Sequence, residues 1–171
     1  MKKLLSILLS LILFGCSENR VLLDELTDKG TEESPLMYYE SGLFNGIGYD
    51  VYSNGQISEE KNYVDGEIDG LFKKWFENGQ KEFEFNWKDG ECNGLFKTWY
   101  ENGQLKGEGN FKDGKEDGLF KVWYENGQLK GEANFKDGEC EDEKCWDENG
   151  NEIASTCSLP LHSHNCPFKE L

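Results

Sequence analysis

A 24-residue segment recurs in register along this chain, and this repetition limits the fold more than any other feature. The two most similar copies read GLFKTWYENGQLKGEGNFKDGKED (94–117) and GLFKVWYENGQLKGEANFKDGECE (118–141), and they agree at 19 of 24 positions. Two more divergent copies lie near 46–69 and 70–93. A fixed period of about 20 to 50 residues is typical of repeat arrays, in which each unit packs only on its neighbours. Such arrays usually bind a partner along a surface.

Each copy has the pattern of two β-strands with a turn after each. In the third copy, residues 95–100 alternate bulky and polar side chains, and 105–111 return as a second strand. The Asn-Gly pair at 102–103 favours a type I′ hairpin turn, in which both central residues have positive φ. Asp-Gly at 113–114 makes the next turn. Equivalent Asn-Gly pairs stand at 54–55, 78–79 and 126–127. The sequence therefore predicts an all-β fold, an elongated antiparallel β-meander of about ten strands.

Aromatic side chains supply the expected core. They make up 13% of a hydrophilic chain, and no single repeat can bury them alone, so stacking should align them into ladders. The rows expected to form this hydrophobic spine are Trp75, Trp99 and Trp123, and Phe72, Phe96 and Phe120. The alternative is that these rings form a platform on which a ligand stacks. Glycines at 107, 109 and 131 are expected where a neighbouring strand or ring approaches closely.

The repeats resemble the MORN repeat, in the bacterial variant sometimes called the YwqK antitoxin family. The resemblance rests on G-L-F-K-x-W-Y-E-N-G-Q-L-K and N-F-K-D-G, which stand complete at 94–114 and 118–138 and more loosely at 70–90 and 46–66. With partial copies at either end, the array covers 37–153. The resemblance implies the hairpin-repeat fold and an antitoxin or immunity role against a cognate toxin.

The N-terminus has the features of a lipoprotein signal. Lys2 and Lys3 precede an apolar stretch, Leu4–Phe14, which is too short to span a bilayer. Gly15-Cys16 then resembles a bacterial lipobox, which predicts a signal peptide over 1–15 and lipidation of Cys16. The alternatives are an uncleaved anchor and an ordinary secretory signal. Residues 16–36 are expected to be a polar tether. The expected location is the cell envelope, at the outer membrane in a Gram-negative organism.

The net negative charge of the chain limits the classes of molecule that it can bind. The chain carries a net charge of −16, and loss of Lys2 and Lys3 with the signal would bring it to about −18. A surface this acidic repels nucleic acid and anionic head groups. The remaining candidates are cationic proteins or divalent cations, and the alternative is that the charge only keeps the ribbon soluble. The repeated residues expected to contact a protein partner are Lys97, Glu101, Lys106, Lys121, Glu125 and Lys130.

Five cysteines besides Cys16 are expected to meet an oxidising compartment. Cys92 and Cys140 occupy equivalent positions two repeats apart, roughly 19 Å by strand spacing, and should not pair. Because five is odd, at least one thiol should stay free or pair between molecules. The tail, 154–171, is expected to be fastened by a disulfide, and the alternatives are that it holds metal or that its thiols stay unpaired. Its weak set of metal ligands is Cys157, His162, His164 and Cys166.

No arrangement of side chains suggests catalysis, and no cofactor is expected. The glutamates at 77, 101 and 125 recur about 10 Å apart at hairpin ends, which is too regular and too far for a pair of catalytic carboxyls. The sequence favours a non-enzymatic, lipid-anchored protein-interaction module. The alternatives are a structural envelope lipoprotein without a toxin partner and a surface protein that binds divalent cations or glycans.

Overall fold

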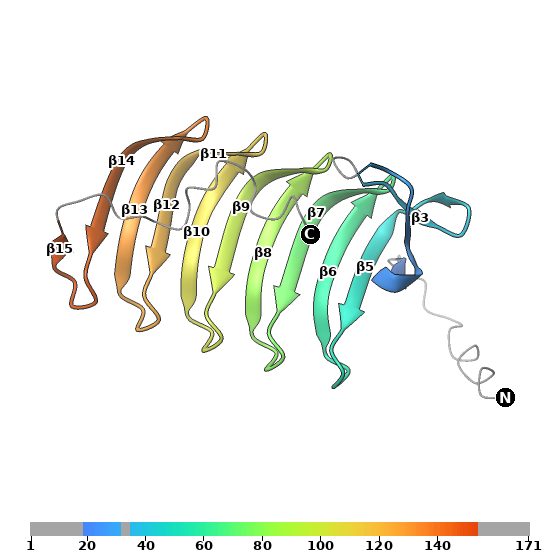
Figure 1. Cartoon of the computed structure of the whole chain (residues 1–171), viewed down its shortest axis with the longest axis horizontal. Coiled ribbons are helices and arrows are strands. Elements are labelled where there is room, and N and C mark those ends of the chain that lie inside the picture. The colour runs from blue at the N-terminus through green and yellow to red at the C-terminus, as the bar shows by residue number, and fades with distance from the viewer. Residues whose placement is uncertain (1–18, 32–34, 154–171) are drawn as a thin grey trace, which may run out of the picture.

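The chain folds into one long ribbon of antiparallel strands, as the repeats predict (Figure 1). The computed structural model describes residues 19–31 and 35–153. Ten strands follow one another in chain order along the sheet, and a two-residue strand, β11 (Lys115–Glu116), pairs beside β10. The ten strands of this meander are β5 (Gly46–Val51), β6 (Ile57–Val64), β7 (Glu67–Trp75), β8 (Lys81–Lys88), β9 (Glu91–Trp99), β10 (Leu105–Lys112), β12 (Gly118–Trp123), β13 (Leu129–Lys136), β14 (Glu139–Trp146) and β15 (Glu152–Ile153).

The turns are of two kinds, and the type I′ prediction is wrong for the Asn-Gly turns. At 100–104, the Gly103 amide donates to the Tyr100 carbonyl, the Tyr100 amide donates to the Gln104 carbonyl, and each N···O distance is 2.8 Å. Only Gly103 of the Asn-Gly pair has positive φ, at +83°. This is a three-residue loop, a type I turn followed by a glycine bulge. The Asp-Gly turns are the type I′ turns, because both residues have positive φ, as at Asp113 (+50°) and Gly114 (+76°).

The two faces of the sheet differ in burial, because side chains alternate along each strand. The core face carries the phenylalanine row as predicted: Phe72, Phe96 and Phe120 are 2%, 6% and 0% exposed. On the same face the Phe85 and Phe96 rings lie 4.3 Å apart between centroids. The tryptophan row does not join this core. Trp75, Trp99 and Trp123 stand three residues after the phenylalanines, so they lie on the opposite face, called the outer face below, and stay half-buried.

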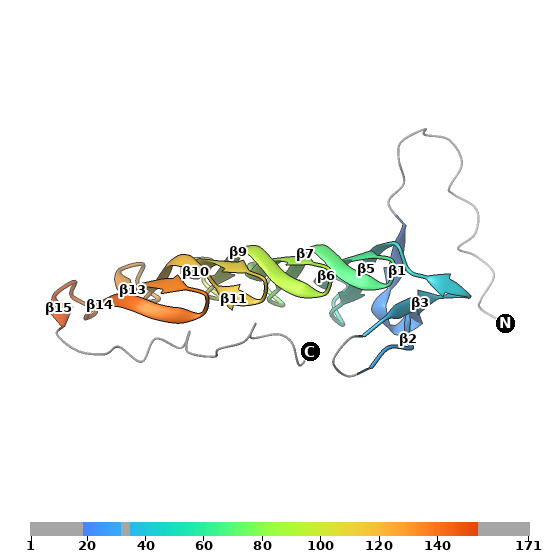
Figure 2. The same ribbon diagram turned by 90° about the horizontal axis from the view of Figure 1, so that it is seen from above.

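Residues Arg20 to Asp28 cap the N-terminal end of the ribbon, so the prediction of a polar tether is wrong for this segment. Strand β1 (Arg20–Leu22) pairs in parallel with β5, and a 3-10 turn follows at Leu23–Glu25. Val21 packs with Phe44 and Tyr63 in a second small core. The remaining strands of the cap are β2 (Thr27–Asp28), β3 (Met37–Tyr39) and β4 (Gly42–Leu43), which form a separate sheet beside the ribbon (Figure 2). Apolar residues at 21–23 are what draw this segment onto the array.

The last hairpin repeats the geometry of the others with one residue fewer. The Gly150 amide donates to the Asp147 carbonyl, and the Asp147 amide donates to the Asn151 carbonyl, so the Asn-Gly turn is preserved. Within the described residues, no helix is long and apolar enough to cross a bilayer.

Candidate interaction surface

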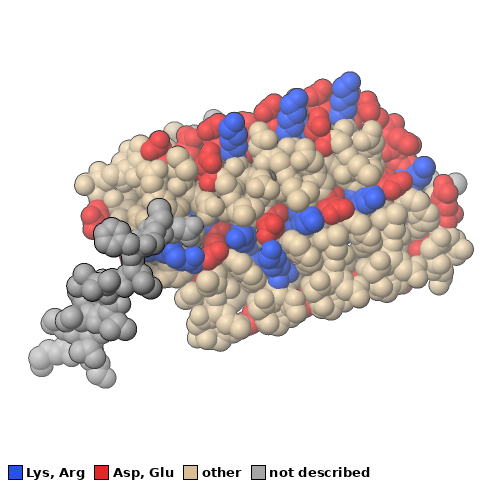
Figure 3. Space-filling model, turned by 180° about the vertical axis from the view of Figure 1, so that it is seen from behind, with Lys and Arg blue, Asp and Glu red and all other residues tan. Residues whose placement is uncertain are grey.

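A ladder of alternating charges crosses the outer face from one end of the ribbon to the other. Each member stands directly opposite the next on the neighbouring strand, and glutamate alternates with lysine at every step. The eight members are Glu60, Lys73, Glu84, Lys97, Glu108, Lys121, Glu132 and Lys144. Figure 3 shows a line of blue and red side chains across the middle of this face with tan bands on either side, and further charged side chains along one edge. Opposite charges in cross-strand pairs favour this register over a shifted one.

The charged side chains of the ladder pair only weakly with one another. Lys97 Nζ lies 3.7 Å from Glu108 Oε2, and both side chains are about one-third exposed (34% and 33%). At the N-terminal end, Arg20 forms an ion pair with Glu60 and lies over the Tyr49 ring. Exposed ion pairs contribute at most about 1 kcal/mol to stability. These lysines and glutamates can therefore exchange partners with a second molecule at little cost.

Apolar rows border the ladder on both sides. Toward the Asn-Gly turns stands the half-buried tryptophan row of Trp75, Trp99 and Trp123, and Lys81 Nζ lies 5.4 Å from the centre of the Trp99 ring. Toward the Asp-Gly turns stand Leu95 and Leu119, which are 45% and 50% exposed. The outer face thus combines apolar area with a regular charge pattern, and both recur once per repeat.

The Asn-Gly turns form a regular acidic rim. The side-chain amide of each turn asparagine donates to the backbone carbonyl of the glutamate in the next turn, which ties successive hairpins together. The N···O distances are 3.4 Å for Asn54–Glu77, 2.8 Å for Asn78–Glu101, 3.2 Å for Asn102–Glu125 and 3.4 Å for Asn126–Glu148. Because the backbone holds these turns, the exposed glutamate side chains are free to face solvent or a ligand.

Tyrosines make a second set of bonds between repeats. A tyrosine hydroxyl donates to a tryptophan carbonyl of the following repeat, at O···O distances of 2.5 Å for Tyr52–Trp75, 2.8 Å for Tyr100–Trp123 and 2.9 Å for Tyr124–Trp146. Burial, followed by the neighbouring charges of Glu125 and Tyr124, raises the pKa of Tyr100. The equivalent residue in the second copy is Phe76, which has no hydroxyl to donate.

The six candidate contact residues fall into three different places. Lys97 and Lys121 belong to the charge ladder, whereas Glu101 and Glu125 stand at the turn tips. The last two, Lys106 and Lys130, follow the turns and lie over the Tyr100 and Tyr124 rings, with Nζ 5.6 Å and 5.5 Å from the ring centres. The structure therefore places only the first pair in the middle of the outer face. Sequence reasoning missed the glutamates that complete the ladder, although hairpin register would have placed Glu108 opposite Lys97.

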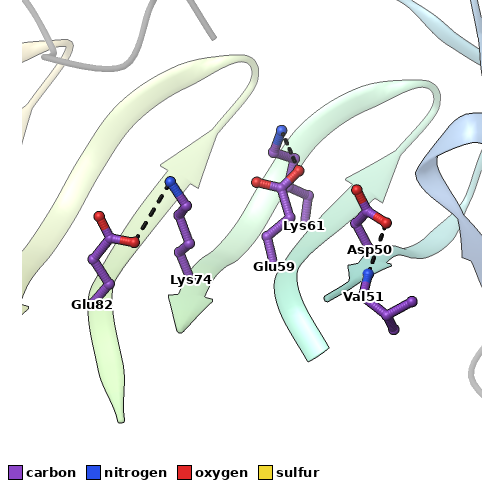
Figure 4. A network of polar contacts seen from close by, with 6 residues as sticks. All are labelled: Asp50, Val51, Glu59, Lys61, Lys74 and Glu82. Atoms are coloured by element: carbon purple, nitrogen blue, oxygen red, sulfur yellow. Dashed lines mark hydrogen bonds and ion pairs between the residues drawn. The ribbon is translucent and has the colours of Figure 1, made fainter. Parts of the chain in front are cut away.

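The core face carries two ion pairs at its N-terminal end (Figure 4). There Lys61 Nζ lies 3.3 Å from Glu59 Oε1, and Lys74 Nζ lies 3.5 Å from Glu82 Oε2. Lys61 also lies over the Phe72 ring, with Nζ 4.7 Å from its centre. These lysines cover the first rings of the core, so this end does not offer a continuous apolar surface.

The described cysteines are in two states. Cys92 and Cys145 are buried and disulfide-bonded, whereas Cys140 is exposed and has a free thiol. Cys92 and Cys140 therefore do not pair, as the strand spacing predicts. Burial first, and the charge of Glu143 second, raises the pKa of the Cys140 thiol.

The remaining predicted sites lie outside the described residues. These are the lipidation site Cys16 and the weak metal ligands Cys157, His162, His164 and Cys166. Within 19–31 and 35–153, no cluster of three or more histidine, cysteine or acidic side chains is arranged to hold a metal ion.

These features define a class of protein: an all-β hairpin-repeat module with a patterned surface. Three segments, 68–89, 93–113 and 116–137, match the sequence profile of the MORN repeat variant. They coincide with the second to fourth hairpin units, so these three units are MORN-variant repeats. No curated protein shows significant similarity to the chain.

Proposed function

We propose that this protein is a non-enzymatic, lipid-anchored interaction module of the cell envelope that binds another protein through its outer face. The observation that carries the proposal is the charge ladder with its apolar borders, which repeats the same set of groups once per hairpin unit. A partner that meets a repeated surface gains affinity from several equivalent contacts. An antitoxin- or immunity-type role, in which the partner is a toxin acting in the envelope, is the specific form of this proposal.

The anchor is proposed from the sequence of the first sixteen residues. A short basic start, an apolar stretch and Gly15-Cys16 favour lipidation of Cys16. Two or three acyl chains would hold the module firmly, because each buried methylene contributes about 0.8 kcal/mol. Cys16→Ser should yield a precursor that incorporates no labelled palmitate. Equal incorporation by this variant would overturn the lipid anchor without affecting the proposed binding face.

Partner capture with charge-matched variants tests the binding face. Full-length protein is immobilised in detergent, exposed to the organism's own envelope fraction, and any bound protein is identified by mass spectrometry and tested again in purified form. Lys97→Gln with Lys121→Gln interrupts the ladder. Lys88→Gln with Lys112→Gln removes the same charge from exposed lysines at the Asp-Gly edge. We expect the ladder variant to lose at least fivefold in affinity, and the edge variant to bind like the wild type.

Other outcomes favour the rival functions. If both variants bind alike, or the edge variant alone is weakened, the outer ladder is not the binding site. If no protein is captured at any salt concentration, a structural role in the envelope is favoured, and retention of divalent cations or glycans would favour the third function. For the toxin form of the proposal, growth inhibition by the identified partner should be relieved when this chain is co-expressed.

A further inference from the structure

In the C-terminal half of the ribbon, core-face side chains are buried although no described residues pack over them. Val122, Ala133 and Cys145 are 6%, 2% and 1% exposed on this face, whereas Leu119, on the outer side of β12, is 50% exposed. Side chains this short cannot bury one another on an open sheet. Among the described residues no second layer lies over β12 and β13 (Figure 2). The cover must therefore come from chain outside them.

The two disulfide-bonded cysteines mark the ends of the covered area. Cross-strand pairing places Cys145 in one row with Gly131, Val122, Gly107 and Thr98. Thr98 and Cys92 share β9 and lie six residues apart, or roughly 20 Å, and four strand spacings add roughly 19 Å at right angles. The two cysteines are thus roughly 28 Å apart. A disulfide needs Cα atoms within about 7 Å, so they bond to other cysteines.

The remaining cysteines are Cys16, Cys157 and Cys166, because Cys140 is free. Cys16 precedes Asn19 by three residues, and Asn19 accepts a hydrogen bond from the Ile47 amide at 2.7 Å, beside β5. That position is five strand spacings, roughly 24 Å, from Cys92, whereas three residues reach only about 10 Å. Cys16 therefore reaches neither Cys92 nor the more distant Cys145.

The number of residues between Ile153 and each tail cysteine limits which of them can reach Cys92 and Cys145. Ile153 pairs directly with Cys145, so it lies roughly 30 Å from Cys92. The four residues from 153 to 157 span at most about 14 Å, which excludes a bond between Cys157 and Cys92. The thirteen residues from 153 to 166 span up to about 45 Å, which is ample. Within one chain, Cys166 is therefore the one remaining cysteine that can reach Cys92, which leaves Cys157 for Cys145.

We propose that the C-terminal segment, 154–171, lies across the core face of this same chain, fastened by disulfides Cys145–Cys157 and Cys92–Cys166. The nine residues between Cys157 and Cys166 span about 31 Å when extended, close to the separation of their two partners. An extended segment of this length is long enough to pass over β13, β12 and β10 between the two partners. Small core-face residues lie along part of this path, Gly131 and Ala133 on β13 and Gly109 on β10, beside the buried rings of Phe120 and Phe111.

This assignment has two consequences. The thiols of the candidate metal ligands Cys157 and Cys166 are consumed, so the segment holds no zinc. The core face is closed to partners, which leaves the outer face as the broad surface of the array. The assignment does not depend on the proposed binding function, since no partner enters the reasoning.

Disulfide mapping of the full-length protein tests the proposal. Protein isolated without reductant is blocked with N-ethylmaleimide in denaturant below pH 7, digested with trypsin, Glu-C and chymotrypsin, and analysed by mass spectrometry. We expect linked peptides for Cys92–Cys166 and Cys145–Cys157 and, Cys16 apart, a label on Cys140 alone. A Cys157–Cys166 or Cys92–Cys157 link would overturn the proposal. So would labels on Cys157 and Cys166 together with release of zinc.

A pair of serine variants provides a second readout. Cys166→Ser should raise the number of labelled thiols from one to two and lower the melting temperature by about 5–10 °C, because a long loop is no longer closed. Cys140→Ser should lower the number to zero and leave the melting temperature unchanged. An unchanged count in Cys166→Ser would contradict the assignment. If that variant does not fold, the peptide map of the wild type decides.

Discussion

At the scale of single residues, successive repeats are joined by tyrosine hydroxyls that donate to tryptophan carbonyls. The repeat itself provides a matched pair of tests, because Tyr100 makes this bond at 2.8 Å and Phe76 holds the equivalent position without a hydroxyl. Tyr100→Phe should lower the free energy of unfolding by about 1 kcal/mol, and Phe76→Tyr should raise it by a similar amount. Urea unfolding followed by tryptophan fluorescence measures both. A loss of stability in both variants would show that ring packing, and not the hydroxyl, decides.

A buried tyrosine predicts how stability depends on alkaline pH. Tyr63 is 4% exposed, and its pKa is raised far above the ordinary value of about 10, by burial first and by the charges of Glu59 and Asp28 second. The raised pKa means that the folded state favours the neutral phenol. Its contribution is therefore complete below pH 10 and is lost as the pH rises above the pKa of the unfolded tyrosine.

The expected result is a urea midpoint that falls between pH 9 and about pH 11, with a smaller fall for Tyr63→Phe than for the wild type. Absorbance at 295 nm should show one tyrosine of the wild type ionising only when the protein unfolds. Parallel falls for the two proteins would contradict the role given to Tyr63.

At the scale of strands, close approach between neighbours explains one glycine. A Cβ atom built on Gly109 would lie 2.2 Å from the Phe120 ring on β12. Gly109→Ala should therefore destabilise the fold by about 1–3 kcal/mol, because the ring has to move within a packed row. The fourth copy already has Ala133 at the equivalent position. Ala133→Gly is the control, and it should cost about 1 kcal/mol or less. Equal stability of Gly109→Ala and the wild type in urea would show that the row is loosely packed.

The strands and their order could be predicted from the sequence. The turn types, and the face of the sheet on which each aromatic row lies, could be predicted only in part. Period and alternation indicated ten hairpin strands, and the structure has them. The type I′ geometry was assigned to Asn-Gly when it belongs to Asp-Gly. The two kinds of turn differ in loop length. The Asp-Gly loop has two residues, whereas the Asn-Gly loop also includes Glu101 and is therefore a three-residue loop with a bulge at Gly103.

The repeat pattern predicts the tryptophan row in the core, because large aromatic residues usually belong there. The three-residue step from Phe96 to Trp99 contradicts that placement, since residues an odd number apart on a strand face opposite sides. The charge ladder is not visible in any single repeat, for a related reason. Its members come from different copies, and only the register of paired strands brings Lys97 between Glu84 and Glu108.

At the scale of the whole molecule, the ribbon has two unlike faces and a cap at its first edge. The cap could not be foreseen from the repeat, because 20–28 share no pattern with it. Its parallel strand β1 and buried Val21 cover the edge that β5 would otherwise expose. On the outer face, the charge ladder and the half-exposed leucines remain open to solvent. The proposed function therefore depends on the outer face, and not the core face, meeting the partner.

Site-specific photocrosslinking in the native envelope tests this point most directly. A benzoylphenylalanine is placed at Leu95 or Leu119 on the outer face, which are 45% and 50% exposed, or at Ile153, which is 45% exposed in the same row as Cys145. These positions match in exposure and differ in face, and none of them interrupts the charge ladder. We predict a covalent adduct with one and the same partner protein at Leu95 and Leu119 and none at Ile153. An adduct at Ile153 alone, or no adduct at either leucine, would contradict the claim that the outer face is the binding surface.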